Sequence, residues 1–328
     1  MTTRPFLHGI DMQTGQASLL WTSAQRLRKA AFVDGRSLLS RRPPALMALR
    51  TFLDRETEPA PPPRYIFHVG FCGSTLLSRL LDVTGQALVL REPNALADIA
   101  NAKAQLAIQD RSNPELAQVV AAASRHLARP WADGEAVVVK PSNWANNILP
   151  MLMSQSGVKA VMMTSSRRAF LEAVLRGGAD RLAFSARAAI HLSSEGKEHA
   201  LLVAAALQAD EDQSGQLARL ALVLHAIQLR QLGTTAKQAE WDESHWLDYT
   251  HLVDDPLGAV RHAADILHLD IATTTIEANI SRWMTRDAKD PQAPFPEHRN
   301  AQLAAAARAE YGSTMEQALN WAERFIAD

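Results

Sequence analysis

Cysteine is nearly absent from this chain of 328 residues, where Cys72 is the only one. An intrachain disulfide is therefore impossible, and nothing in the sequence points to an oxidising compartment. The chain also lacks an excess of charge of either sign, because 34 basic and 35 acidic residues leave a formal net charge of −1. This balance argues against a nucleic-acid-binding protein, so any anion site must be local.

Long hydrophobic runs are missing too. The longest, around Leu201–Ala206, is far too short to span a bilayer, and the first residues lack the apolar core of a secretory signal. The 11 histidines show no metal-ligand spacing. We therefore expect a cytoplasmic protein without a metal that contacts neither membrane nor nucleic acid. The sequence leaves open whether the protein forms a homo-oligomer.

The proline-rich stretch Glu58–Arg64 divides the chain, because proline fixes φ and cannot continue a helix. We expect residues 1–62 to form a small N-terminal α/β element with this connector, and residues 63–328 to form the main domain. In the first part the pattern predicts a strand at Ser18–Thr22 and helices at Ala24–Phe32 and Pro44–Leu53.

Apolar runs alternate with helical patterns after the connector. This alternation predicts a three-layer α/β domain, with a mostly parallel sheet of about five strands and helices on both faces. The strands are expected at Tyr65–Val69, Ala87–Leu90, Ala136–Val139, Val158–Met163 and Ser244–Leu247. The helices are expected at Ala95–Ile108, Leu116–Leu127, Gln216–Leu232, Ala301–Ala307 and Met315–Ile326.

A glycine-bearing turn follows the first of these strands, in the sequence VGFCGSTLL from Val69 to Leu77. Such a turn directs backbone N–H groups into one concavity, and the next helix adds its own N–H groups and the positive end of its dipole. Gly73 lets the backbone approach an anion closely, while Ser74 and Thr75 offer hydroxyl groups. The pattern indicates a phosphate site, although the hydroxyls could simply cap the helix. The Walker lysine is absent, which disfavours a magnesium-NTP hydrolase.

The end of this turn, Cys72–Leu77, resembles the loop of sulfotransferases that use 3′-phosphoadenosine-5′-phosphosulfate (PAPS). Bacterial members of that family often read Pro-Arg-Ser-Gly-(Ser/Thr)-Thr-Leu-Leu here. Trp246–Pro256, followed by Ala259–Leu269, is similar to the family's Tyr-Glu-Asp-Leu … Asp-Pro … Leu-Gly-Leu segment. The resemblance covers about residues 64–328 and implies a P-loop NTPase-like fold, with PAPS as the bound nucleotide.

Several positions depart from the family pattern. Phe71 stands where the family has a basic residue that touches the 5′-phosphate and the transferring group. In the family's 3′-phosphate motif, Ser165 replaces the first arginine, Arg168 matches the second, and Ala173 replaces a helical serine. The run Arg286–Phe295 matches a basic loop that closes over the nucleotide. The resemblance thus implies nucleotide contacts by Gly70, Phe71, Cys72, Gly73, Ser74, Thr75, Leu76, Ser165, Arg168, Arg286 and Lys289.

Two strand ends carry the expected catalytic residues. Glu92 follows the second strand, where several bacterial sulfotransferases place a glutamate general base. Its alternative roles are an ion pair with Arg91 or a cap for the helix that begins near Asn94. Lys140 ends the third strand and could neutralise the transferring group, partly replacing the charge missing at Phe71. Its alternative role is a lysine that only reaches solvent.

Other residues have plainer expected roles. Arg79, on the helix after the turn, is expected at the surface. Cys72 is expected to be a small residue in a crowded turn, although a helix N-terminus would favour a reactive thiolate. Ser142 and Asn143 are expected to cap the next helix. The helices between Gly177 and Leu232 are expected to build an acceptor pocket.

Three functions follow from these features. The first is a sulfotransferase that moves a sulfuryl group from PAPS to a hydroxyl or amine of a small molecule. The second is a nucleotide-binding protein without transfer activity. The third is an ATP-dependent phosphotransferase that relies on Lys140. The charge near Phe71 should discriminate between them.

Overall fold

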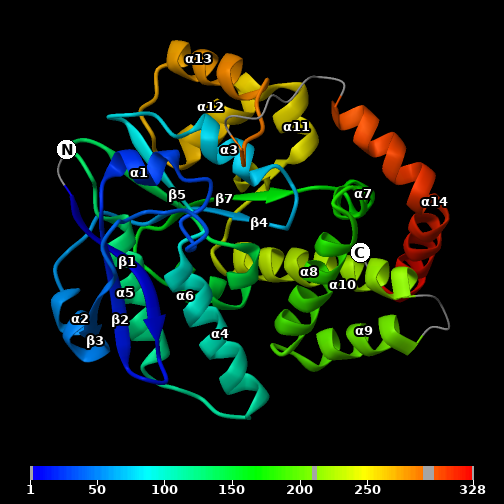
Figure 1. Ribbon diagram of the computed structural model, residues 1–328, viewed down its shortest axis with the longest axis horizontal. Helices are drawn as coiled ribbons and strands as arrows, with labels where there is room; N and C mark the ends of the chain where they lie inside the picture. The colour runs from blue at the N-terminus through cyan, green and yellow to red at the C-terminus, as the bar shows by residue number, and fades with distance from the viewer. Residues whose placement is uncertain (1–2, 209–212, 291–298, 327–328) are drawn as a thin grey trace.

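The computed structural model describes residues 3–208, 213–290 and 299–326. Its middle layer is a five-stranded parallel sheet with the strand order β5-β6-β4-β7-β8, and helices cover both faces (Figure 1). The predicted three-layer α/β architecture is therefore confirmed. The strands are β4 (Arg64–His68), β5 (Ala87–Arg91), β6 (Ala136–Lys140), β7 (Lys159–Thr164) and β8 (Trp246–Asp248).

Strand β4 lies at the centre of this sheet, and its residues from Tyr65 to His68 are buried because helices cover both faces. The chain leaves β4 towards β5 on one side, returns to β6, and then crosses to β7 and β8 on the other side. In open α/β sheets, ligands bind beyond the carboxyl ends of the strands where the winding changes direction. The turn that follows β4 occupies that place.

The helices of the two faces come from different parts of the chain. One face carries α3 (Ser74–Leu80), α11 (Tyr249–Asp254), α12 (Pro256–Ile266) and α13 (Thr273–Trp283), with the short 3₁₀ helix η2 (Glu243–His245) before β8. The other face carries α4 (Asn94–Ile108), α5 (Leu116–Ala128), the 3₁₀ helix η1 (Asn143–Ile148) and α6 (Leu149–Met153).

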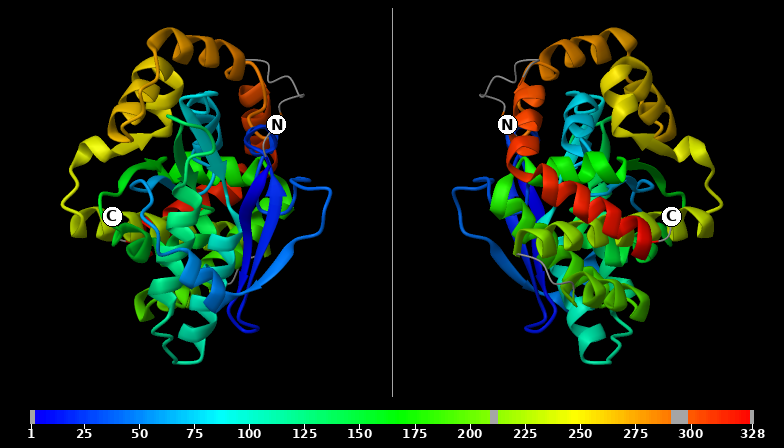
Figure 2. Two further views of the ribbon diagram at one scale, coloured as in Figure 1. Left: turned by 90° about the vertical axis from the view of Figure 1, so that its left-hand side faces the viewer. Right: turned by 90° about the vertical axis from the view of Figure 1, so that its right-hand side faces the viewer.

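A cluster of longer helices adjoins the carboxyl ends of the strands and has a hydrophobic core of its own. Its central member is α10, whose residues from Leu220 to Ile227 are almost all inaccessible to solvent. In the right-hand view of Figure 2, α14 runs along this cluster. Its members are α7 (Arg167–Leu175), α8 (Gly178–Ser193), α9 (Lys197–Gln208), α10 (Gln213–Gln238) and α14 (Arg299–Phe325).

The N-terminal element is a three-stranded antiparallel sheet with two short helices, and its hairpin stands at the side of the molecule (Figure 2). Its apolar residues join the hydrophobic cluster of the main sheet. The element comprises β1 (Arg4–Asp11), β2 (Gln16–Thr22), α1 (Ala24–Lys29), β3 (Ala45–Ala48) and α2 (Leu49–Arg55).

Three expectations were wrong in detail. Strand β1 was not predicted. The expected helix Pro44–Leu53 is instead strand β3 followed by α2, because residues 45–48 pair with β2. The two expected C-terminal helices form one helix, α14. The other predicted strands and helices are present, and their ends differ by up to six residues, with the largest difference at the C-terminal end of α10.

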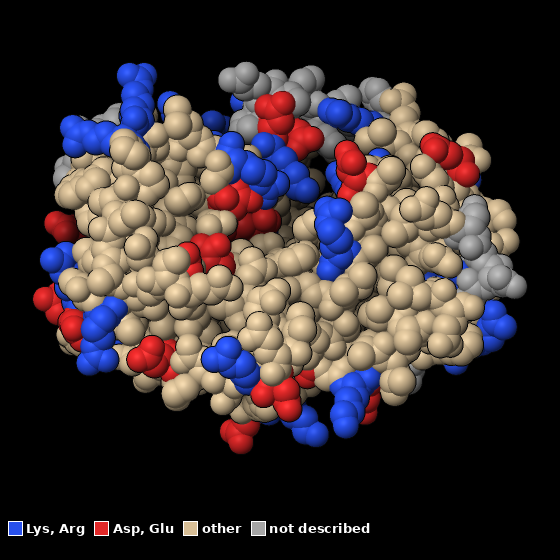
Figure 3. Space-filling view, turned by 60° about the horizontal axis from the view of Figure 1, so that its bottom comes forward, with Lys and Arg blue, Asp and Glu red and all other residues tan. Residues whose placement is uncertain are grey.

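On the face shown in Figure 3, basic and acidic side chains alternate over a largely uncharged surface, without a continuous basic stripe. In the described part of the chain, every helix is too short or too polar to cross a membrane.

Candidate functional site

The glycine loop, residues 70–75, connects β4 to α3. Gly73 precedes α3 and has a φ of +79°, which favours glycine. A β-carbon on Gly73 would lie 2.6 Å from Cδ2 of Tyr249, and one on Gly70 would lie 2.9 Å from Nδ2 of Asn143. Packing therefore requires glycine at both positions, so side chains of the protein closely surround the loop.

The backbone N–H groups of the loop are only partly used by the protein. Gly70 donates to Oε1 of the buried Gln228 at 2.9 Å. Among the described residues, the N–H groups of Gly73, Thr75 and Leu76 have no hydrogen-bond partner. Several donors at the start of α3 thus remain available, as is usual for a helix N-terminus.

Phe71 adopts a left-handed conformation, with a φ of +58°. Its ring makes edge contacts with Phe170 and Phe184, at centroid distances of 5.8 Å and 6.3 Å. The guanidinium carbon of Arg181 lies 5.5 Å from the centre of the same ring. Burial lowers the pKa of Arg181, and Arg176 lowers it further. A cation therefore adjoins the position where the family's loop has a basic residue, although it comes from α8.

Cys72 is fully buried in the loop, and its thiol donates a hydrogen bond to the carbonyl of Val69. Burial raises the pKa of this thiol to about 12, against the smaller effects of Ser74 and Lys140. A reactive thiolate is disfavoured, and the expectation of a small residue in a crowded turn agrees with this environment.

Glu92 and Lys140 form an ion pair where β5 and β6 end side by side, with 2.7 Å between Oε1 and Nζ. The Lys140 side chain is 1% exposed. The other carboxylate oxygen of Glu92 lies 3.3 Å from Nη2 of Arg36, in the N-terminal element. Burial acts to raise the pKa of Glu92, but Lys140 outweighs it together with His68 and Arg36, so the pKa is lowered. The carboxylate is therefore ionised at neutral pH.

The alternative roles considered for these two residues are wrong. Arg91 is fully buried and pairs with Asp82 at 2.9 Å rather than with Glu92. The N-cap of α4 is Pro93, without a side-chain cap. Lys140 does not reach solvent. Glu92 instead has a left-handed backbone with a φ of +58°, an unusual conformation that is often found at functional sites.

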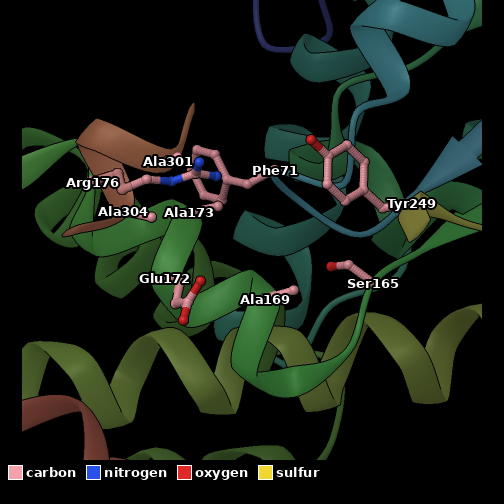
Figure 4. Close-up of a pocket in the computed structure, with 9 residues that line it drawn as sticks. All are labelled: Phe71, Ser165, Ala169, Glu172, Ala173, Arg176, Tyr249, Ala301 and Ala304. Atoms are coloured by element: carbon pink, nitrogen blue, oxygen red, sulfur yellow. The ribbon is translucent and has the colours of Figure 1, made fainter. Parts of the chain in front are cut away.

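A cavity of about 270 Å³ borders the other side of the glycine loop (Figure 4). The hydroxyl of Ser165 is buried beside it and has no hydrogen-bond partner in the described part of the chain. Glu172 in its wall pairs with Arg308, 3.8 Å apart. The cavity is lined by Phe71, Ser165, Ala169, Glu172, Ala173, Arg176, Tyr249, Ala301 and Ala304.

Tyr249 and Arg176 are among the lining residues that the sequence had not indicated as site residues. Tyr249 lies inside the recognised segment Trp246–Pro256, but nothing in its spacing singles it out. Arg176 lies three residues beyond Ala173, so the two share a face of the helical segment, and the helical period could have indicated it.

The basic residues that were expected to contact the nucleotide lie in different parts of the structure. Arg168 is 53% exposed and forms a two-pronged ion pair with Glu316 of α14, at 2.6 Å and 3.1 Å. Lys289 is exposed, but protein atoms around it still lower its pKa by desolvation, and the charges of Arg181, Glu92 and Lys140 act on it as well. Arg286 is exposed. Residues 291–295 of that run lie outside the described residues.

Arg79 is buried rather than at the surface, which corrects the prediction. Its guanidinium donates to three carbonyl groups, those of Arg28, Ala30 and Ala288, at 2.7 Å, 3.2 Å and 3.1 Å. It therefore joins the helix after the glycine loop to both ends of the chain. Ser142 caps η1 as predicted, by accepting from the N–H of Trp144.

Comparison with known proteins finds no matching family model and no matching curated protein. A solved structure, the sulfotransferase domain from the curacin biosynthetic pathway, aligns over 83% of this chain and 99% of its own length. The sequence identity is 10% and the TM-score is 0.42. These values describe a distant similarity, so functional inferences for this chain come from its own geometry.

Proposed function

We propose that this chain binds PAPS by its 5′ end at the glycine loop and transfers the sulfuryl group to a hydroxyl or amine of a small molecule. One observation carries the proposal: the loop borders a cavity through Phe71, while Glu92 and the buried Lys140 pair at the ends of β5 and β6, on the other side of β4 from β7. A nucleotide donor and an acceptor would thus meet at the loop.

The residues present fit such a nucleotide. A β-carbon on Gly70 or Gly73 would collide with Asn143 or Tyr249, so these two side chains lie directly against the loop backbone where the 5′ end would bind. The buried donors beside the loop that lack a hydrogen-bond partner among the described residues include Nδ2 of Asn143 and the hydroxyl of Ser165. The loop N–H groups with Ser74 and Thr75 would hold the 5′ end, while Ser165, Arg176 and Tyr249 would hold the nucleoside end. Lys289, Arg286 and Arg168 remain proposed contacts for the 3′-phosphate.

Bound PAPS would supply a sulfuryl group activated by its anhydride bond to phosphate. Lys140 and Arg181 would neutralise negative charge at that group, because both cations lie beside the loop in largely buried positions. Glu92 would accept the proton of the acceptor hydroxyl. Its lowered pKa keeps it in the required ionised form, while the Lys140 ammonium holds one of its oxygens in place.

A second function, nucleotide binding without transfer, is favoured by one observation. Phe71 packs against Phe170 and Phe184, so apolar atoms surround most of its ring. The nearby Arg181 argues for the first function. A phosphotransferase using ATP remains a third proposal that rests on Lys140.

Calorimetry with 3′,5′-adenosine bisphosphate tests the nucleotide site. We expect wild-type protein to bind it and Gly73→Asp to lose binding, because the new carboxylate would occupy the loop. Gly134→Asp is the matched control, since Gly134 is also left-handed, with a φ of +74° and open space around it. Equal binding by all three proteins would contradict the site. Binding of magnesium-ATP but not of the bisphosphate would favour the phosphotransferase.

A further inference from the structure

Basic residues are concentrated in one segment of the N-terminal element. Residues 24–50 contain seven of the 34 basic residues and a single acidic residue, Asp34, although the whole chain is nearly neutral. Three of the seven have carboxylate partners: Arg28 with Asp82 and Glu135, Arg36 with Asp34 and Glu92, and Arg50 with Asp54. The remaining four, which give the segment its excess of positive charge, are Arg26, Lys29, Arg41 and Arg42.

Three of these four, Arg26, Lys29 and Arg41, line one hollow of about 550 Å³. The rest of its wall is neutral and comprises Ala30, Ala31, Ser37 and Leu38. Within the described residues, none of the three cations has an ion pair, and Arg26 makes one long hydrogen bond, 3.4 Å to a backbone carbonyl. Like charges held around one hollow repel each other, so an anion there would be stabilised.

This segment is fixed to the main sheet by buried hydrogen bonds. Arg91, at the end of β5, donates to the carbonyl groups of Leu27, Arg28 and Ala30. Its own carbonyl accepts from the N–H of Val33 at 2.8 Å. The hollow therefore has a fixed position relative to the carboxyl end of β5, where Glu92 follows.

The same segment contacts the candidate catalytic pair. The ring centre of Phe32 lies 5.9 Å from Nζ of Lys140, and Arg36 stacks on that ring while it reaches Glu92. Ser37, in the wall of the hollow, directly follows Arg36. Because neighbouring Cα atoms are about 3.8 Å apart, the hollow begins one residue from a side chain that touches Glu92.

We propose that this cationic hollow binds an anionic group of the acceptor, such as a phosphate or carboxylate, while the acceptor hydroxyl or amine reaches Glu92. Ala30, Ala31 and Leu38, which is 80% exposed, offer apolar contact to its carbon frame. This assignment rests on the proposed sulfuryl transfer and places the acceptor against the N-terminal element rather than against the helices from Gly177 to Leu232.

Calorimetry with inorganic phosphate tests the hollow apart from any activity. The test uses Gly73→Asp protein, whose glycine loop is blocked, and we expect this protein to bind phosphate in the hollow. Adding the double substitution Arg26→Ala/Arg41→Ala should weaken its phosphate affinity by about tenfold or more. The control Arg42→Ala/Arg50→Ala removes the same charge from the same segment outside the wall, and phosphate affinity should stay within about twofold. Equal weakening by both pairs would overturn the site.

A second variant avoids the altered loop. Leu38→Glu places a carboxylate in the hollow at an exposed position, where the fold should tolerate it, and should remove one phosphate site from the otherwise wild-type chain. Unchanged stoichiometry would contradict the proposal.

Kinetics then separate the acceptor role from the proposed chemistry. With PAPS, hydroxyl compounds that carry a phosphate should show a KM about tenfold higher in Leu38→Glu, with little change in kcat, whereas their neutral analogues should not respond. If neutral analogues react equally well and Leu38→Glu has no effect, the anionic acceptor is wrong while the transferase stands. Phosphate binding without turnover on any acceptor would instead refute the transferase, and noncompetitive inhibition by phosphate would identify a free-anion site.

Discussion

The two sides of the glycine loop each contain a non-glycine residue in a left-handed conformation, but different forces hold the two residues. Phe71, with a φ of +58°, is held by aromatic rings beside the cavity. Glu92 has the same φ and is held by two cations. Such a conformation persists only where its surroundings enforce it. We infer that aromatic packing fixes the backbone on one side of the loop and that charge fixes it on the other.

Removing the carboxylate of Glu92 should have the largest effect. Glu92→Gln keeps the size of the side chain but cannot accept a proton, so we expect turnover to fall by about 10²–10⁴-fold. Affinity for 3′,5′-adenosine bisphosphate should be retained, because the change lies on the far side of the loop from the cavity. Turnover assays and calorimetry measure the two effects. Glu277→Gln, at an exposed position on α13, is the control, and full activity of Glu92→Gln would rule out the base role.

Breaking the ion pair should have the next largest effect. Lys140→Met leaves a largely buried carboxylate with Arg36 as its remaining direct partner, and should lower the free energy of unfolding by about 3 kcal/mol. The double variant Lys140→Met/Glu92→Leu removes both charges and should regain most of that loss. Urea unfolding at pH 7 measures both. A double variant no more stable than the single one would show that the pair is not the cause.

Lowering the pH should reduce the stability that His225 and Glu92 contribute on the two sides of the loop, but in different pH ranges. Burial lowers the pKa of His225, which bonds to the carbonyl of Ser165 beside the cavity, to about 4. The unfolded chain therefore binds the proton first, and this stability is lost as the pH falls from about 6.5 towards 4, at up to about 1.4 kcal/mol per pH unit. Glu92 has a lowered pKa, so its contribution is present above its unfolded pKa of about 4.3 and is lost only below that.

His225→Gln isolates the first of these effects, since glutamine can donate the same hydrogen bond but does not titrate. We expect a smaller loss of stability between pH 6.5 and 4 than in the wild type, measured by urea unfolding at each pH. An identical slope in the two proteins would assign the effect to other groups.

The smallest effect is expected on the aromatic side. Phe71→Gly loses ring contacts but relieves the left-handed backbone, and the two changes offset each other to leave a loss of about 1 kcal/mol. Because packing rather than charge is removed, this loss should be equal at low and high salt. Urea unfolding in 0.05 M and in 1 M salt, where the Debye length is about 14 Å and about 3 Å, measures the loss of stability at the two salt concentrations.

Much of the fold could be predicted from the sequence because the local sequence patterns agree with the tertiary structure. Every strand of the main sheet was predicted, since two-sided burial requires continuous apolar runs. Residues 45–48 were mistaken for helix because their partner, β2, lies far from them in the sequence and overrides local preference. β1 was missed for a different reason, because it begins with Arg4 and Pro5 and its pairing with β2 shifts register between Leu7 and Gly9.

Site residues were predicted where they directly follow a strand, and they were missed where they reach the site from an element distant in the sequence. Glu92 and Lys140 follow neighbouring strands, so their meeting could be foreseen. Arg36 and Arg181 reach the site from loops and helices whose docking no local pattern encodes. Arg176, directly after α7, lines the cavity instead of Arg167 or Arg168, and this depends on how that helix packs, which only coordinates could decide.

The carbonyl contacts of Arg79 have a consequence for synthesis. One of its three acceptors, Ala288, lies 209 residues further along the chain, so a ribosome must finish nearly the whole protein before this guanidinium has all its acceptors. Until then α3 lacks one of its anchors, and the loop before it is held less firmly. A nascent or C-terminally shortened chain should therefore gain no protection from nucleotide, and only the finished protein would be rescued from proteolysis by it.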